Sequence, residues 1–324
     1  MKICLAALFS LACTLSAPIA NAQEQNYPNQ PIQIVVGFPP GGSADSTARL
    51  IGEGLGKEFG QPVIVVNKPG AGTSIAAEFV AKAPADGYTL LLGGNTLVYG
   101  PGLLYPTMKS NLAQDFAPIG GVVTTPLILV TRSDSPFQNV QQLVAAAKSK
   151  PGQLNYGSTG SGIITQIAVE MLDARAGISM THIPYKGTAP MLTAMLSGDI
   201  EVAFDVVSSS APMIQAGRLR GLGISGSKRL KTFPQIPTIA ESGYPGFDAI
   251  AWYGLAAPQR TPPAVVQKLN TALQKVLANP KTQQTLESTG NEVMSGTPAD
   301  FQNFLNAERS KWTTAVKQLN IKLD

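Results

Sequence analysis

The sequence has very little cysteine and histidine. Its two cysteines, Cys4 and Cys13, both lie within the first 22 residues, and its single histidine is His182. From residue 23 onward there is no thiol for a disulfide or for cysteine chemistry, even in an oxidising compartment. Zinc sites draw most of their ligands from these two residue types, so the sequence predicts no metal site.

Several catalytic signatures are missing as well. No G-x-x-x-x-G-K-[ST] stretch occurs, which excludes a Walker-type phosphate loop. Residues 70–75 begin like a dinucleotide fingerprint, but Ile75 takes the place of the third glycine, and there is no G-x-S-x-G elbow. A Ser–His–Asp triad would need His182, which we expect to be structural, and no two carboxylates stand out as an acid–base pair. We therefore expect a protein that is not an enzyme and that uses no cofactor.

Dense basic clusters and long apolar runs are also missing after the N-terminus. The formal net charge of +4 is spread along the chain, which argues against nucleic-acid binding. The only targeting signal is at the start, where Lys2, an apolar core over residues 3–15 and the small-x-small site 20–22 predict a signal peptide over 1–22, cleaved after Ala22. A lipoprotein signal at Cys13 is the alternative, although Ser10 stands where leucine is usual.

Strand and helix patterns alternate through two successive units. The first has strand patterns near 34–36, 63–66 and 88–92, and the second has them near 154–156, 181–185, 201–204 and 219–225, with helical spacing between them. This alternation predicts an α/β fold with mostly parallel sheets flanked by helices. A terminal section can return to the first unit, so we expect lobe 1 to comprise 23–125 and 226–324, lobe 2 to comprise 126–225, and a ligand cleft to lie between them.

The most informative stretch follows the first strand. The turn contains Phe38, Pro40, Gly41 and Gly42, and Ser43 is a good N-cap for the helix that follows. Such a turn directs free backbone N–H groups and the positive end of a helix dipole at one point, which makes an anion site without a catalytic side chain. An ordinary strand–turn–helix joint is the alternative.

A second glycine-rich turn, residues 157–162, leads into the helix that begins near Ile163. Ser158, Thr159 and Thr165 offer hydroxyl donors there. In open α/β sheets the ligand lies beyond the carboxyl ends of the strands. If the lobes face each other, the two turns can hold one anion or both ends of a dianion.

Three further residues are weaker candidates. Asn95 ends a strand on the same side, with a plain turn role as the alternative. Tyr185, like Phe38, could form a wall of the cleft, with core packing as the alternative. Asp205 ends an apolar strand, where an unpaired charge is costly, so it either caps the next helix or accepts a donor from the ligand.

Motifs spread along the chain resemble, in order, those of the tripartite tricarboxylate transporter substrate-binding proteins, the Bug family. They lie at 27–28, 31–32, 38–42, 45, 48–49, 67–72, 86–90, 115–116, 156–158, 182–187, 237–243 and 252–258. The resemblance implies a two-lobed periplasmic binding protein of type II, a Venus flytrap, that captures a small organic carboxylate or dicarboxylate. It further implies a monomer that delivers this ligand to integral-membrane transporter subunits. A carboxylate sensor for a signalling receptor and a secreted hydrolase are the alternatives.

The resemblance also carries over ligand positions, residue by residue. It places the ligand carboxylate near Phe38, Pro40, Gly41, Gly42, Ser43, Ser158, Thr165 and Asp205. The chain departs from the family pattern at Ile163-Ile164-Thr165-Gln166, where many members are more polar. With Ile163 and Ile164 at the second turn, we expect a less polar ligand, such as an aromatic or branched carboxylate.

Overall fold

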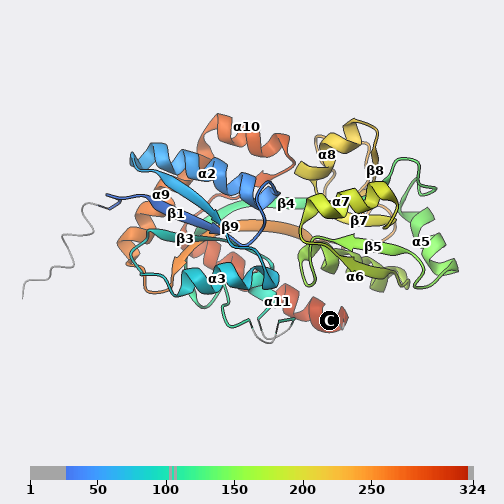
Figure 1. Ribbon diagram of the computed structural model, residues 1–324, viewed down its shortest axis with the longest axis horizontal. Helices are drawn as coiled ribbons and strands as arrows, with labels where there is room; N and C mark the ends of the chain where they lie inside the picture. The colour runs from blue at the N-terminus through green and yellow to red at the C-terminus, as the bar shows by residue number, and fades with distance from the viewer. Residues whose placement is uncertain (1–26, 102–103, 106–107, 320–324) are drawn as a thin grey trace, which may run out of the picture.

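The computed structural model describes residues 27–101, 104–105 and 108–319, so the predicted signal peptide lies outside the described residues. The described strands form one curled ten-stranded sheet with the order β2-β1-β3-β9-β4-β7-β5-β6, and β8 and β10 pair with β4. Helices cover both faces of the sheet (Figure 1). The predicted α/β class is confirmed.

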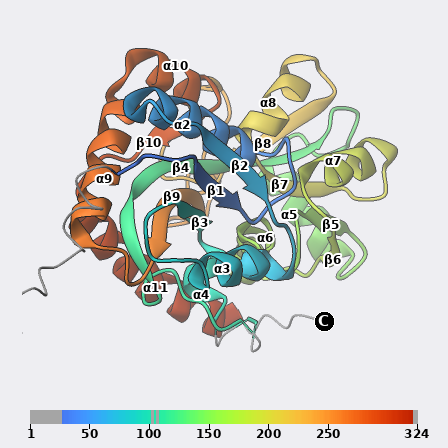
Figure 2. The ribbon, with the colours of Figure 1, turned by 60° about the vertical axis from the view of Figure 1, so that its left-hand side comes forward.

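The first half of the fold is built on three parallel strands, β1 (Ile32–Val36), β2 (Val63–Asn67) and β3 (Thr89–Gly94). Its other elements are α2 (Ser43–Phe59), η1 (Ala71–Thr73), α3 (Ser74–Ala81), α4 (Thr96–Tyr99), α9 (Pro263–Ala278), α10 (Pro280–Ser288), β10 (Glu292–Val293) and α11 (Pro298–Leu319). Helices α2, α9 and α10 lie on one side of the strands, and α3, α4 and α11 lie on the other (Figure 2).

Apolar spacing explains the first strand and helix. Ile32, Ile34 and Val36 are fully buried in β1, and in α2 the residues Ala48, Ile51 and Leu55 are fully buried at helical spacing. Helix α2 ends at Gly60, whose φ of 65° is the left-handed conformation that glycine adopts without strain. The apolar pattern therefore fixes which face of α2 lies on the sheet, and so where its N-terminus lies.

The second half has three parallel strands of its own, β5 (Asn155–Ser158), β6 (Thr181–Pro184) and β7 (Val202–Val206). Its remaining elements are α5 (Val140–Ser149), α6 (Ile164–Ala176), α7 (Thr188–Ser197), α8 (Val207–Gln215) and β8 (Leu219–Ile224). The sheet as a whole is mixed rather than mostly parallel, because the two strands at its centre pair antiparallel with their neighbours.

Those two strands, β4 (Phe116–Arg132) and β9 (Ile250–Pro258), join the halves. In β4, Pro126 pairs with β9 of the first half, and the next residue, Leu127, pairs with β7 of the second. This change of partner lies beside the predicted lobe boundary at 125/126. The division into lobes stays a prediction.

The return to the first half comes later than we expected. Phe233 and Ile236 pack in the same buried cluster as Met191 of α7, and Ser225 Oγ donates a hydrogen bond to the carbonyl of Ala249 at 2.6 Å. Residues 226–249 thus pack with the second half. A boundary at 249/250 fits these contacts better than one at 225/226.

Helix α11 runs along both halves. Phe301 and Leu305 pack beside Trp252 in the first half, whereas Trp312 and Val316 belong to the buried cluster that contains Ile167 of α6. The halves are therefore linked by two strands and by one helix.

Candidate functional site

A cavity of about 560 Å³ lies between the two halves, beyond the carboxyl ends of β1, β3, β5, β6 and β7. This is the usual ligand position in open α/β sheets. The first half contributes the turn after β1, the end of β3 and residues 251–253 of β9. The second half contributes residues that follow β5, β6 and β7.

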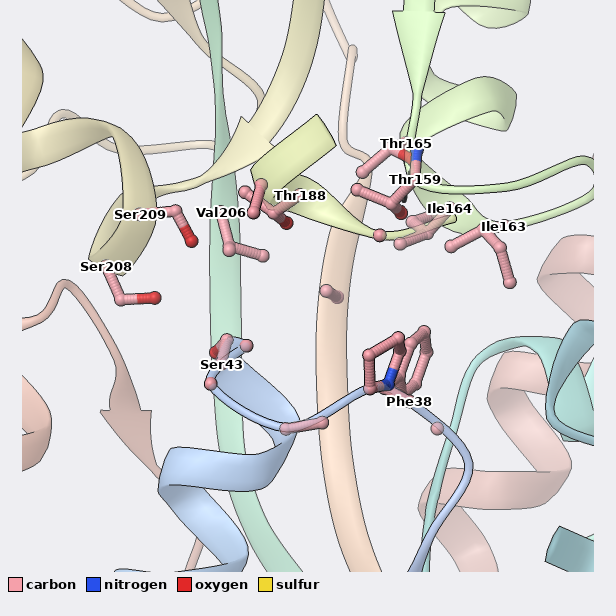
Figure 3. Close-up of a pocket in the computed structure, with 18 of the residues that line it drawn as sticks. Phe38, Ser43, Thr159, Ile163, Ile164, Thr165, Thr188, Val206, Ser208 and Ser209 are labelled. Atoms are coloured by element: carbon pink, nitrogen blue, oxygen red, sulfur yellow. Dashed lines mark hydrogen bonds between the residues drawn. The ribbon is translucent and has the colours of Figure 1, made fainter. Parts of the chain in front are cut away.

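Four helices begin at the wall of this cavity. Ser43 opens α2, Ile164 opens α6 and Thr188 opens α7, and Ser208 and Ser209 lie in the first turn of α8 (Figure 3). None of the four has a side-chain cap among the described residues. The first N–H groups of a helix have no partner within the helix, and its dipole is positive there, so four such ends favour a bound anion.

Buried hydroxyl groups at the wall also lack partners. Within the described part of the chain, Ser208 Oγ and Thr73 Oγ1 are buried and make no hydrogen bond, and Ser43 Oγ is buried beside the hydroxyl of Tyr253. Buried polar atoms are nearly always paired, so such a group at a cavity indicates a missing partner. Thr73 also has a φ of 74°, a strained conformation for a residue other than glycine and typical of functional sites.

The first turn is held rigidly by side chains behind it. The N–H of Gly41 donates to Asp45 Oδ2 at 2.9 Å, and Asn67 Nδ2 donates to the carbonyl of Phe38 at 3.0 Å and to Asp45 Oδ1 at 2.9 Å. Arg49 completes the group with two bonds to the same carboxylate. Burial opposes ionisation of Asp45, but these hydrogen bonds outweigh it and hold its pKa below the usual range.

The second turn is held by its own hydroxyls and by the first half. Thr165 Oγ1 accepts the N–H of Thr159 at 3.0 Å and lies 3.0 Å from Thr159 Oγ1. Gly162 donates its N–H to Gln166 Oε1 at 2.6 Å, and its carbonyl accepts the hydroxyl of Tyr99 from the first half at 3.1 Å. The polar groups of this turn are thus largely paired.

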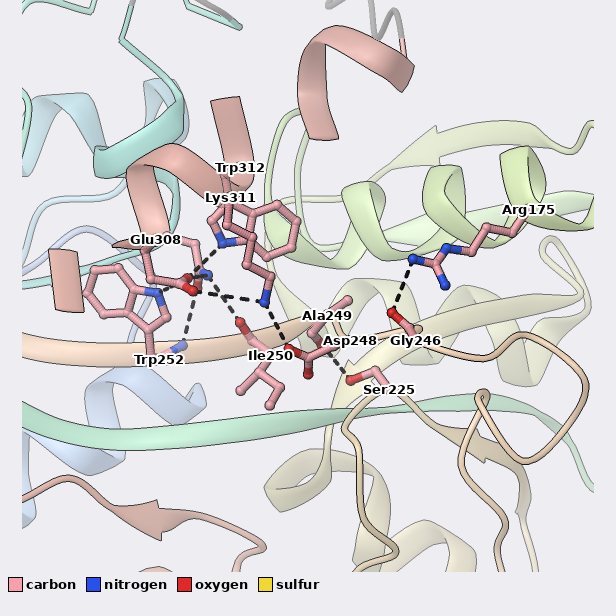
Figure 4. Close-up of polar contacts among 11 residues, drawn as sticks. Arg175, Ser225, Gly246, Asp248, Ala249, Ile250, Trp252, Glu308, Lys311 and Trp312 are labelled. Carbon is pink, nitrogen blue, oxygen red and sulfur yellow. Dashed lines mark hydrogen bonds and ion pairs between the residues drawn. The ribbon is translucent and has the colours of Figure 1, made fainter. Parts of the chain in front are cut away.

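The floor of the cavity is fixed by a partly buried carboxylate. Trp252 and Asn95 line the cavity, and the indole Nε1 of Trp252 donates to Glu308 Oε2 of α11 at 2.8 Å (Figure 4). The indole of Trp312 donates to the same oxygen at 2.7 Å, and Asn95 Nδ2 lies 3.5 Å from it. Asn95 Oδ1 in turn accepts the backbone N–H of Trp252 at 3.1 Å.

Most of the predicted ligand residues lie on the cavity wall: Phe38, Pro40, Gly41, Gly42, Ser43, Asn95, Thr159, Ile163, Ile164 and Thr165. Whether they contact a ligand stays a prediction. Thr188, Val206, Ser208 and Ser209 also lie on the wall and were not among the predicted ligand residues. Each of these residues lies where a strand is followed by a helix. The same strand-to-helix pattern predicts ligand residues at the glycine-rich turns, and it could have been applied here as well.

Ser158, Tyr185 and Asp205 are not on the wall, so we correct their expected position. Ser158 is fully buried, and its Oγ lies 2.6 Å from His182 Nε2. Tyr185 packs against the core cluster of α7. Asp205 is fully buried; its carboxylate accepts hydrogen bonds from Ser210 Oγ at 2.6 Å and from Thr188 Oγ1 at 3.3 Å.

The charges near the cavity are few. Lys186 supplies the only charged side chain of the wall within the described residues, and it is exposed. Burial raises the pKa of Asp205 to about 6, although the hydrogen bonds from Ser210 and Thr188 act in the opposite direction. Burial also raises the pKa of the Tyr253 hydroxyl on the wall to about 12, so this group stays protonated at neutral pH.

The described residues show neither a metal-binding cluster nor a membrane-spanning helix. Among residues 27–101, 104–105 and 108–319, no three His, Cys, Asp or Glu side chains are placed to hold a metal ion. None of the described helices combines the length and the apolar character that crossing a bilayer requires.

The chain matches known proteins over nearly its whole length. Residues 47–321 match the family model described as "Tripartite tricarboxylate transporter family receptor". The solved structure "R. palustris Rpa4515 with adipate" is 33% identical with a TM-score of 0.88, covering 91% of this chain and 99% of the other. The periplasmic binding protein BugD is 32% identical with a TM-score of 0.85, covering 91% and 99%. MatC (Rpa3494) from Rhodopseudomonas palustris with bound malate is 30% identical with a TM-score of 0.84, covering 90% and 100%.

Proposed function

The chain belongs to the tripartite tricarboxylate transporter receptor family, which includes the Bug proteins, and from this premise we propose that it binds a small organic carboxylate in the cavity between its two halves. The observation that carries the proposal is the meeting of four helix N-termini without side-chain caps, within the described residues, at one cavity whose wall holds a single charged side chain. Backbone donors of this kind suit a carboxylate.

The same proposal includes the periplasm as the site of action and a membrane transporter as the recipient of the ligand. The predicted signal peptide over 1–22 supports export, and the family assignment supports the transporter. Binding would draw the halves together about β4 and β9, the two strands that connect them. Co-purification of the transporter subunits with the ligand-loaded protein would test the recipient.

A hydrolytic function has less support. Ser158 and His182 lie within hydrogen-bonding distance, as a nucleophile and a base would. However, Ser158 is fully buried and lies off the cavity wall, so a substrate in the cavity would not reach it. We therefore propose a receptor that releases its ligand unchanged.

Carboxylates and their amides provide the test. Isothermal titration should compare adipate and hexanoate with the corresponding amides. At least one of the two acids should bind, and neither amide should bind. At a free ligand concentration of 100 Kd, the bound acid should add about 2.7 kcal/mol to the free energy of unfolding. Absence of binding by every acid tried, or equal binding of acid and amide, would contradict the proposal.

One pair of variants isolates the backbone donors. Ser43 is the first helical residue of α2, and the preceding Gly42 has φ −82° and ψ 174°, which a following proline accepts. Ser43→Pro removes both the N–H and the hydroxyl, whereas Ser43→Ala removes only the hydroxyl. A charge-assisted hydrogen bond is worth about 1.5–3 kcal/mol, so Ser43→Pro should weaken carboxylate binding about 10- to 150-fold beyond Ser43→Ala.

A further inference from the structure

The two ends of the cavity differ in chemistry. At one end Ser43 faces Thr188, Ser208 and Ser209 across the gap, and these residues come from the first turns of α2, α7 and α8 (Figure 3). At the other end Phe38 faces Ile163 and Ile164 (Figure 3). We refer to these as the polar end and the apolar end.

Unpaired donors mark the polar end. Ser208 Oγ makes no hydrogen bond to any described residue, and Ser43, which is 8% exposed, lies beside the hydroxyl of Tyr253 and interacts with it. Three of the four helix N-termini meet here. A carboxylate at this end would therefore supply an acceptor for the Ser208 hydroxyl and for the O–H that the Ser43–Tyr253 pair leaves free.

At the apolar end the hydroxyls of Thr159 and Thr165 are partly paired. Thr159 and Thr165 bond to each other, as described above. Ile163 and Ile164 are 7% and 6% exposed, so their side chains form part of a wall largely closed to water. Thr73, which packs against Gly37 at the start of the first turn, offers one unpaired hydroxyl, and a single neutral hydroxyl cannot balance a carboxylate.

A second ligand carboxylate would have fewer partners than the first, because the apolar end has one helix N-terminus, that of α6, and the polar end has three. The exposed Lys186 is the only charged residue on the described wall, and an ion pair with an exposed lysine contributes little because water and salt screen it. A carboxylate placed among Phe38, Ile163 and Ile164 would lose its hydration with only that one helix end to replace it. An alkyl or aryl group placed there would gain from burial.

We propose that the ligand is a monocarboxylate with an apolar body, whose carboxylate is bound at the polar end and whose body packs against Phe38, Ile163 and Ile164. This proposal rests on the proposed function of the same cavity and narrows its ligand class. Each additional methylene group buried at the apolar end should increase the affinity for the ligand about fourfold.

Hexanoate and adipate test the proposal directly, because they share a six-carbon chain and differ only in the second carboxylate. In isothermal titration of the purified protein at neutral pH, hexanoate should bind at least tenfold more tightly than adipate, and butanoate should bind more weakly than hexanoate. Rpa4515, whose solved structure holds adipate, serves as the positive control for adipate in the same buffer. A hexanoate preference below tenfold, or a preference for adipate, would overturn the inference and leave the proposed carboxylate receptor intact. Binding of none of these acids would instead remove the proposed function, and the inference with it.

A matched pair of variants tests the location of the apolar body. Ile164→Val and Ile164→Thr give side chains of the same shape that differ by one hydroxyl. The threonine variant should bind hexanoate at least fivefold more weakly than the valine variant, with both melting within a few degrees of each other. Equal hexanoate affinities in two folded variants would place the apolar body elsewhere and refute this part of the proposal.

Discussion

Replacement of Glu308 should weaken ligand binding even though this residue is not on the cavity wall. Its Oε2 accepts the indole N–H groups of Trp252 and Trp312 and lies near the amide of Asn95 (Figure 4). Trp252 and Asn95 line the cavity, so one carboxylate of α11 fixes two side chains on which a ligand would rest. Loss of that carboxylate should release both.

The hydrogen bonds set the size of the effect. A hydrogen bond to a charged group contributes about 1.5–3 kcal/mol and a neutral one about 0.5–1.5 kcal/mol. Glu308→Gln keeps an oxygen that can accept both indoles but loses the charge, which should cost about 2 kcal/mol of stability in total. Glu308→Ala leaves both indole N–H groups without their acceptor and should cost about 3–6 kcal/mol. In a chain of 324 residues, 2 kcal/mol corresponds to a decrease in Tm of about 3 °C.

The assay follows from the composition. The chain has only two tryptophans, and both donate to Glu308, so intrinsic fluorescence reports on this site without a label. Glu308→Gln should shift the emission maximum and reduce the change that a bound carboxylate produces, and the affinity should fall about tenfold, or about 1.4 kcal/mol.

Lys311→Gln is the control for this prediction. Lys311 Nζ lies 3.9 Å from Glu308 Oε1 and 2.9 Å from Asp248 Oδ2, and its removal leaves both indole hydrogen bonds in place. Such partly exposed pairs are worth at most about 1 kcal/mol, so this variant should resemble the wild type in melting and affinity. Its emission is not part of the control, because Lys311 Nζ lies 5.1 Å from the centroid of the Trp312 ring. If Glu308→Gln matched the wild type in melting, emission and affinity, or if Lys311→Gln were equally damaging, the reasoning would be refuted.

Three further predictions concern groups behind the wall. Because burial raises the folded-state pKa of Asp205 from 3.8 to about 6, its contribution to stability should be greatest below pH 3.8 and should be lost as the pH rises through 6. Carboxylate binding should tighten as the pH falls through the same range. In Asp205→Asn the binding trend should disappear between pH 4 and 8, and the melting trend should become smaller, because Asp173, whose pKa burial raises to about 7, still contributes to it. Asn67→Ala removes three hydrogen bonds behind the first turn and should cost about 1–3 kcal/mol in chemical denaturation, whereas Arg49→Gln, at an exposed arginine, should cost less. Tyr99→Phe removes the buried hydrogen bond between the halves, from the Tyr99 hydroxyl to the carbonyl of Gly162. It should weaken ligand binding about fivefold, equivalent to about 1 kcal/mol, and leave the circular dichroism spectrum unchanged. An unchanged affinity would show that this hydrogen bond does not favour the form in which the halves are closed on the ligand.

Local patterns were sufficient to predict most elements of the fold. All the residues of the apolar run Ile34–Val35–Val36, and the helically spaced Ala48, Ile51 and Leu55, are fully buried in the structure. Their spacing along the sequence is enough to predict which element they form and which face of it is buried. Helix α10 was missed because its sequence is largely polar and only Thr282 and Leu286 are buried, so no apolar stripe marks it.

The positions of single polar side chains could not be predicted in this way. Asp205 ends a strand as expected, but it pairs with Ile128 of β4, and Thr188 and Ser210 enclose its carboxylate. Ser158 is turned to His182 because β5 and β6 pair in a register that no local pattern specifies. In a strand, neighbouring side chains point to opposite faces of the sheet. Which of the two faces lies at the cavity depends on the long-range pairing register, which the local sequence does not specify.

One of the two strands that join the halves, β9, also lines the cavity, so a ligand bound there would touch the connection between the halves. Ala251, Trp252 and Tyr253 line the cavity from β9, directly after the residue at which the chain returns to the first half. Glu308 ties this segment to α11, whose far end packs against the second half. A ligand that contacts the floor of the cavity therefore contacts β9, one of the strands that connect the halves, directly and not through an intervening loop. Because a ligand shifts a conformational equilibrium only by its difference in affinity for the two states, that difference arises from ligand contacts made with both halves at once, as with Phe38 and Ile163. Affinity and closure should accordingly change together in variants of either end of the cavity as well as in variants of β9 and of Glu308.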